Sequence, residues 1–104
     1  MKKHSFYSMI HKDGKSCAVI QNGYSDGTFY YYATGERYKT WYAIHPLTGL
    51  SVTYGYSRNE CAEKAHSPAL CENINNVMEE RGERLTAEFE KAIQETKAAE
   101  AVKK

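Results

Sequence analysis

The chain has 104 residues, of which 41% are hydrophobic and 26% charged, and its formal net charge is +1. These values fit one folded domain and exclude a protein whose overall field draws it to nucleic acid or to an anionic membrane. They also exclude a membrane-spanning helix, since no stretch approaches the roughly 20 apolar residues that such a helix needs, and no apolar run of signal-peptide length follows Met1–His4.

Charge and aromatic residues divide the chain near Ser57. Residues 1–57 carry six Lys/Arg against three Asp/Glu, a net +3, whereas residues 58–104 carry eight against ten, a net −2. All nine tyrosines and the single tryptophan lie in the first part. We therefore expect two structural parts within one domain spanning residues 1–104.

Turn-forming residues recur at short intervals over residues 5–56 and predict an antiparallel meander. Asp13-Gly14 is a strong hairpin signal, because both central positions of a two-residue turn need positive φ. A looser turn at 23–27, a two-residue turn at Gly35-Glu36 and a loop at Pro46–Gly49 complete the series. The strands are predicted at about 5–12, 15–22, 28–34, 37–45 and 50–56.

These turns also predict the register, and hence which side chains share a sheet face. Tyr30 is expected opposite Trp41, and Trp41 opposite Tyr54. The last strand alternates large apolar with small polar residues, so we expect the face with its large residues to form the core. This face carries Phe6, Ile10, Cys17, Val19, Tyr30, Tyr32, Trp41, Ala43, Leu50, Val52, Tyr54 and Tyr56. The second face carries Tyr7, Met9, Ala18, Ile20, Phe29, Tyr31, Ala33, Tyr38, Tyr42 and Ile44.

The second part reads as two helices. The capping box Ser57-Arg58-Asn59-Glu60 predicts a short helix over 57–66, and Pro68 is well placed to start a helix over 68–98. Apolar residues recur at helical spacing along it, and Gly82 on that stripe either permits close packing or breaks the helix. Residues 99–104 are expected to fray. The predicted fold is α+β, with the C-terminal helix packed on one sheet face.

Three soft ligands, Cys61, His66 and Cys71, raise the question of a metal site. Zinc ligands usually come in tight C-x2–4-C pairs, whereas the spacing here is C-x4-H-x4-C. We therefore interpret the two cysteines as small apolar residues of a helix face and expect no metal and no cofactor. An odd number of cysteines favours a reducing compartment, so a cytoplasmic bacterial or phage protein is expected.

Catalytic patterns do not emerge from the sequence. It shows no Cys/His order typical of a nucleophile, no phosphate-cradling glycine loop and no paired carboxylates in the sheet half. The chain is therefore expected not to be an enzyme.

The second sheet face holds more aromatic surface than a solvent face requires, which predicts a binding surface. Such rings act as rigid anchors in protein interfaces, or stack unpaired bases while Lys and Arg meet phosphates. Since basic residues are few, we favour a protein partner, bound by this face or by an edge strand. Nucleic acid and a homodimer that buries the face remain alternatives. The candidate binding residues are Tyr7, Phe29, Tyr31, Arg37, Tyr38, Lys39 and Tyr42.

Two resemblances narrow this expectation. The hairpin from Trp41-Tyr42-Ala43-Ile44 to Ser51-Val52-Thr53-Tyr54, followed by the capped helix from Ser57, is similar in its order of elements to the DNA-binding arms of some mobile-element integrases. The similarity covers under half the chain, and most of the basic residues that such an arm aims at DNA are missing. In size and composition the chain resembles small phage and mobile-element inhibitors of host defence nucleases, which implies an inhibitor of a nucleic-acid-processing enzyme.

Overall fold

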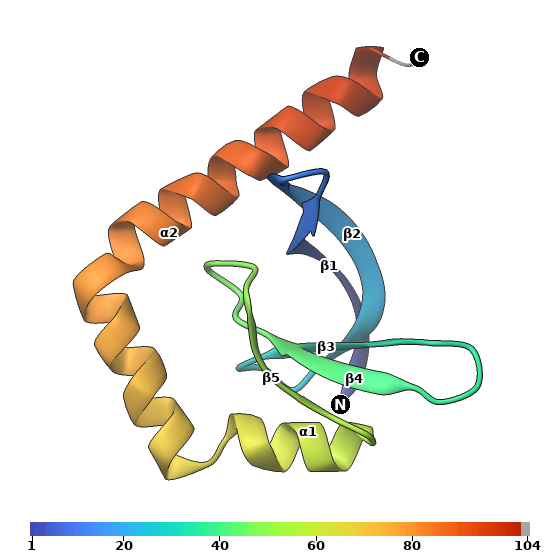
Figure 1. Cartoon of the computed structure of the whole chain (residues 1–104), viewed down its shortest axis with the longest axis vertical. Coiled ribbons are helices and arrows are strands. Elements are labelled where there is room, and N and C mark those ends of the chain that lie inside the picture. The colour runs from blue at the N-terminus through green and yellow to red at the C-terminus, as the bar shows by residue number, and fades with distance from the viewer. Residues whose placement is uncertain (103–104) are drawn as a thin grey trace.

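A computed structural model describes residues 1–102 and contains a five-stranded antiparallel sheet followed by two helices (Figure 1). The strands pair in chain order, β1-β2-β3-β4-β5, so the predicted meander and the α+β fold are confirmed. The elements are β1 (Lys2–Lys12), β2 (Lys15–Ser25), β3 (Tyr30–Thr34), β4 (Thr40–Ile44), β5 (Ser51–Gly55), α1 (Arg58–Ala65) and α2 (Pro68–Val102).

The first hairpin forms as its turn residues predict. Asp13 and Gly14 have φ of 53° and 76°, and Lys12 pairs with Lys15 directly beside them. Pairing continues to Lys2 and Ser25, so both strands are longer than predicted and β2 runs through Gly23. The turn into β3 is therefore formed by residues 26–29.

The predicted register on both sides of β4 is wrong. Thr34 pairs with Thr40, which leaves residues 35–39 in a five-residue loop instead of a two-residue turn at Gly35-Glu36. Tyr30 consequently lies opposite Ile44, three positions from Trp41, the partner that the turn had predicted. On the other side Trp41 lies opposite Gly55, one position from Tyr54. The register thus differs from the prediction by three residues against β3 and by one residue against β5. Because side chains alternate between the two faces of a strand, a shift by an odd number of residues exchanges the faces of β4 relative to both neighbours.

The predicted core face is wrong for the same reason. Tyr31, which was expected outside the core, pairs with Ala43, which was expected in it, and both are completely buried. Tyr54 and Tyr56, which were expected in the core, are 52% and 72% exposed. Gly55 explains why the tyrosines of β5 point away from the core. A Cβ at Gly55 would lie 2.9 Å from the Cys61 backbone nitrogen, so α1 can pack only on the side of β5 that has no large side chain. The small residues of β5 mark the side on which α1 packs closely.

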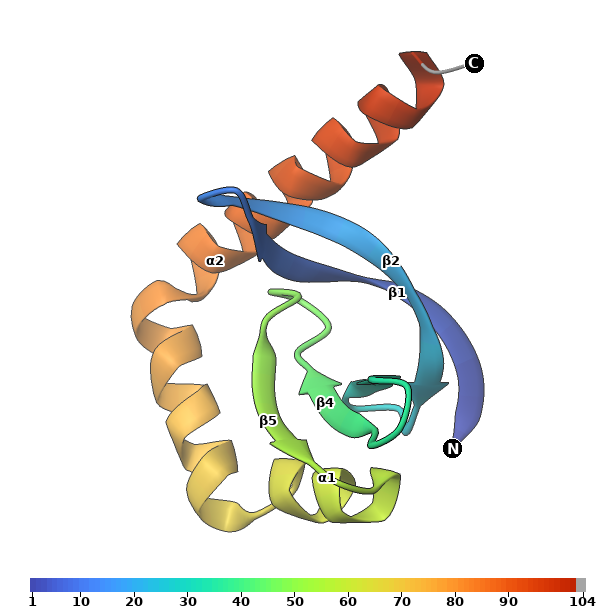
Figure 2. The ribbon, with the colours of Figure 1, turned by 45° about the vertical axis from the view of Figure 1, so that its right-hand side comes forward.

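The two helices cover different parts of the sheet (Figures 1 and 2). Helix α1 packs on β4 and β5, and its Cys61 and Ala65 join Phe29, Tyr31 and Ala43 in one core cluster. The capping box forms, since the Ser57 hydroxyl accepts the Glu60 N–H at 3.1 Å and the Glu60 carboxylate accepts the Tyr56 N–H at 3.0 Å.

Helix α2 is continuous through Gly82, so the alternative of a break there is wrong. Its second half packs on the first hairpin, where Phe89 and Ala92 enclose Ala18. The helix continues to Val102 instead of fraying from residue 99, and residues 103–104 lie outside the described part of the chain. Within residues 1–102 no helix combines the length and the apolar content needed to cross a membrane.

The sheet is strongly curled, with the first hairpin arching over the other strands (Figure 2). The Met9 N–H donates to the Gly49 carbonyl at 2.8 Å, which ties the edge of β1 to the β4–β5 loop. At Gly23 the backbone of β3 comes so near that any Cβ would overlap the Tyr31 carbonyl oxygen. The curl therefore depends on a position without a side chain.

Candidate functional site

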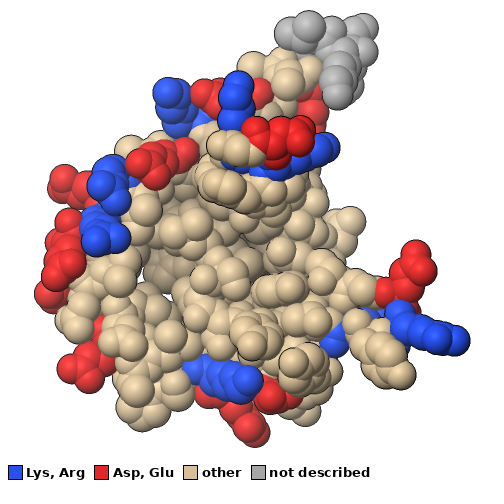
Figure 3. Space-filling view, in the orientation of Figure 1, with Lys and Arg blue, Asp and Glu red and all other residues tan. Residues whose placement is uncertain are grey.

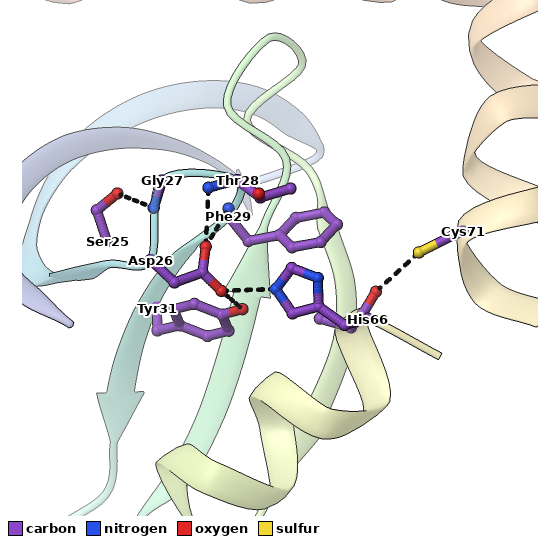
Figure 4. Close-up of polar contacts among 9 residues, drawn as sticks. Ser25, Asp26, Gly27, Thr28, Phe29, Tyr31, His66 and Cys71 are labelled. Carbon is purple, nitrogen blue, oxygen red and sulfur yellow. Dashed lines mark hydrogen bonds and ion pairs between the residues drawn. The ribbon is translucent and has the colours of Figure 1, made fainter. Parts of the chain in front are cut away.

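The turn between β2 and β3 places one carboxylate where the sheet meets the helices (Figure 4). Asp26 Oδ1 accepts the backbone N–H groups of Thr28 and Phe29, both at 2.8 Å. Its Oδ2 accepts the Tyr31 hydroxyl at 2.5 Å and His66 Nε2 at 2.7 Å. Since His66 caps the end of α1, Asp26 joins the sheet to the corner between α1 and α2.

The surroundings of Asp26 keep it ionised. Burial of the carboxyl acts to raise its pKa, but the hydrogen bonds from Phe29, Tyr31, His66 and Thr28 outweigh burial and lower the pKa from 3.8 to about 2. Burial and the bond to Asp26 raise the pKa of Tyr31 well above its usual range, so this phenol stays protonated.

Two further side chains near His66, those of His45 and Cys71, form hydrogen bonds within the chain. A cavity of about 240 Å³ beside His66 is also lined by His45 and Cys71. His45 Nδ1 accepts the Leu47 N–H at 3.2 Å, and the Cys71 thiol donates to the Ala65 carbonyl at 3.5 Å. Burial lowers the pKa of His45. These hydrogen bonds, with those of Asp26, tie three segments of the chain together.

The predicted helix-face role of Cys61 is confirmed, since its side chain is fully buried in the α1 core cluster. Burial raises the pKa of its thiol to about 11, and the thiol donates to the Trp41 carbonyl at 3.5 Å. In the described part of the chain, no three His, Cys, Asp or Glu side chains are grouped as a metal site would require.

The predicted binding residues do not share one face, because the register slips separate them. Phe29 and Tyr31 are 4% and 0% exposed beneath α1. Tyr7 packs against the Ala18–Phe89 cluster under α2, with Lys97 Nζ 5.9 Å from its ring centre. Phe29 and Tyr31 are therefore core side chains, whereas Tyr7 is half-buried at the edge of a core cluster.

The other four candidates lie elsewhere. Arg37, Tyr38 and Lys39 occupy the exposed β3–β4 loop, where Tyr38 is 87% exposed. Tyr42 lies on the sheet face opposite Tyr31, and its ring stacks on Tyr32 at 5.5 Å.

We expect Tyr31→Phe to lower the free energy of unfolding by about 1–2 kcal/mol, because it removes the buried donor to Asp26. Tyr38→Phe removes the same hydroxyl from an exposed ring and should change stability by less than about 0.5 kcal/mol. Urea denaturation of both variants measures the difference. Equal effects would contradict the assignment of Tyr31 to the core.

An aromatic row crosses the sheet face that carries no helix. It consists of His4, Phe6, Tyr30, Tyr32 and Tyr42, whose stacked neighbours lie 4.8–5.5 Å apart with interplanar angles of 19–29°. Rings that stack on one another occupy each other's flat faces. The row therefore offers less flat ring surface for nucleic-acid bases than separate rings would.

An apolar groove lies between β5 and α2, visible as the hollow inside the curve of α2 in Figure 3. Its volume is about 220 Å³. The apolar residues that line it come from the β4–β5 loop, β5 and the first half of α2: Leu50, Val52, Leu70, Ile74, Val77, Met78 and Leu85. Leu50 and Val77 are 40% and 44% exposed, so the groove is open. We call it the β5–α2 groove.

The groove runs beside the last strand of the sheet. No strand within residues 1–102 pairs with the outer edge of β5. Lys64 Nζ donates to the Tyr54 carbonyl at 3.3 Å, so the backbone polar groups of Tyr54 point away from β4, toward that edge. A strand edge that pairs with no other strand in the described chain, and on which Lys64 bonds one carbonyl, thus lies beside an apolar groove.

Sequence reasoning did not find the Asp26 cluster or the groove. Asp26 was assigned only to a turn, and the stripe of α2 was assigned to packing on the sheet. One signal for the groove was present, because a stripe from Leu70 to Ile93 is longer than one short sheet can cover.

Comparisons with known proteins do not assign the chain to a family. No protein-family model, no curated protein and no solved structure matches it. The residues themselves, rather than a relative, therefore carry the functional proposal.

Proposed function

We propose that the chain is a small non-enzymatic protein-binding module that holds an extended segment of a partner along the edge of β5. The observation that carries this proposal is the juxtaposition of a free strand edge with the apolar β5–α2 groove. An exposed edge is a template for another strand. In strand addition, main-chain hydrogen bonds supply affinity and pockets for alternate side chains supply specificity. Here β5 supplies the main chain and α2 the pockets.

The size of the groove supports a peptide over a small-molecule ligand. Its volume of about 220 Å³ is below the roughly 300–1,000 Å³ typical of small-molecule sites. A groove of that size suits a few side chains. Since side chains of a strand alternate in direction, a segment paired with β5 directs every second side chain toward α2.

Protein is also favoured over nucleic acid by the tyrosines near β5. Tyr54 and Tyr56 are largely exposed and contact each other edge to face at 6.4 Å between ring centres. Tyrosine is enriched at protein interfaces because its ring is rigid, apolar and ends in a hydrogen-bonding hydroxyl. The narrower hypothesis of an inhibitor from a phage or mobile element stays a prediction from size and composition.

Selection from a displayed library of random 12-residue peptides tests the proposal. We expect the immobilised protein to enrich peptides that bind it in fluorescence anisotropy, and Val77→Asp to weaken that binding more than tenfold by placing a charge in the groove. Asn76→Asp makes a similar change on the neighbouring exposed residue, which does not line the groove, and should leave binding within twofold.

Two results would overturn the proposal. One is a library that yields no peptide sensitive to Val77→Asp. The other is light scattering that shows a stable dimer which Val77→Asp dissociates, because the groove would then be filled by a second copy.

A further inference from the structure

We infer that the β5–α2 groove selects extended segments that carry a carboxylate side chain beside their apolar positions. This rests on the proposed function and adds the chemistry of the partner. The residue that points to it is Arg81.

Arg81 lies in the middle of the apolar stripe that α2 presents to the groove. Val77 and Leu85, which both line the groove, are four residues before and four residues after it. Residues four apart lie above one another on a helix surface, so Arg81 occupies the same side of α2. An arginine thus stands between two apolar residues of a row that begins, one turn before Val77, with the polar Asn73.

Arg81 has no ion-pair partner within residues 1–102 and is exposed. Arg84, one turn further along, lies 3.8 Å from Glu88, a long contact between two side chains that are 65% and 60% exposed. Exposed pairs of this kind add little stability, so a partner's carboxylate can compete for Arg84 as well.

The charges around the groove favour an acidic occupant. Figure 3 shows Lys and Arg of α2 beside the hollow, interspersed with Asp and Glu along the helix. Within the described chain, no Asp or Glu lines the groove, so a bound carboxylate meets no like charge there. Lys64, which donates to the Tyr54 carbonyl at the edge of β5, already forms an ion pair with Glu60 at 3.3 Å and therefore adds little to this preference. Arginine's planar fork matches a carboxylate with two parallel hydrogen bonds.

The same peptide selection tests this inference. Enriched peptides should contain Asp or Glu more often than the unselected library, next to alternating apolar residues. For a fluorescein-labelled enriched peptide, Arg81→Gln should weaken binding about tenfold, and amidating the peptide's Asp or Glu should weaken it equally. The two changes together should cost no more than either alone, because they remove the same contact. Lys15→Gln, at the exposed tip of the first hairpin, is the matched control and should not alter binding.

The possible outcomes separate this inference from the function on which it rests. Peptides that depend on Val77 but are indifferent to Arg81→Gln and carry no acidic residue would leave the peptide-binding function standing and overturn the selection of a carboxylate. A library without any Val77-dependent peptide would overturn both.

Discussion

Gly23→Ala should lower the free energy of unfolding by about 3 kcal/mol or more, enough to unfold a domain of ordinary stability. A Cβ at this position would overlap the Tyr31 carbonyl oxygen and lie 3.1 Å from the Phe6 ring. The obstacle is backbone, which cannot turn aside as a flexible side chain can. Because β2 and β3 share only the pairs Tyr24–Tyr31 and Ser25–Tyr30, a shift there disturbs their whole connection.

The matched control is Gly82→Ala, which should have the opposite sign. Glycine inside a helix costs roughly 1 kcal/mol relative to alanine. The nearest atom to the added Cβ is the terminal methyl of Met78 at 3.2 Å, which a flexible thioether chain can withdraw. We therefore expect unchanged or slightly higher stability. Urea denaturation followed by circular dichroism measures both variants, and similar values for the two would contradict the close approach of β3 to Gly23.

Asp26→Asn should have the second largest effect, a loss of roughly 2 kcal/mol at pH 7, since each pKa unit corresponds to about 1.4 kcal/mol. The substitution keeps an acceptor for the Thr28 and Phe29 N–H groups but removes the charge that Tyr31 and His66 contact.

The pH dependence of stability distinguishes the contribution of the Asp26 charge from that of its hydrogen bonds within the turn. The pKa of Asp26 is lower in the folded chain, about 2 against 3.8, so its stabilisation is complete above pH 3.8 and disappears as the pH falls toward 2. The difference between the wild-type chain and Asp26→Asn should therefore shrink as the pH falls below about 5. Denaturation curves between pH 3 and pH 7 measure this difference.

The matched control is Asp13→Asn in the first hairpin turn, where asparagine also tolerates the positive φ of 53°. It should alter stability by less than about 0.5 kcal/mol at every pH, because Asp13 is exposed. A difference for Asp26→Asn that persists unchanged at pH 3 would show that the carboxylate does not stabilise the fold through its charge.

Local structure could be predicted wherever one residue type has a clear conformational preference. The turn at Asp13-Gly14, the capping box at Ser57 and the helix start at Pro68 all formed as predicted. Each depends on neighbours within four residues, so the sequence contains all the information that is needed.

The register of β4 could not be predicted, because the length of its preceding loop depends on distant contacts. A two-residue turn at Gly35-Glu36 is compatible with local preference, but the five-residue loop lets Tyr31 and Ala43 share the face that α1 covers. Loop closure costs little per added residue, whereas burying two more core side chains is worth several kcal/mol. Packing therefore decided the length of the loop, and with it the face on which Tyr42 lies.

The sequence by itself determined the order and type of the elements, because φ preferences, caps and apolar periodicity act over a few residues. Only the tertiary structure decided which tyrosines are buried and where a partner can bind. Tyr31 is in the core because its hydroxyl reaches Asp26, and the small residues of β5 face α1 because Gly55 admits Cys61. The β5–α2 groove exists because α2 packs its second half on the first hairpin and leaves its first half beside a free strand edge.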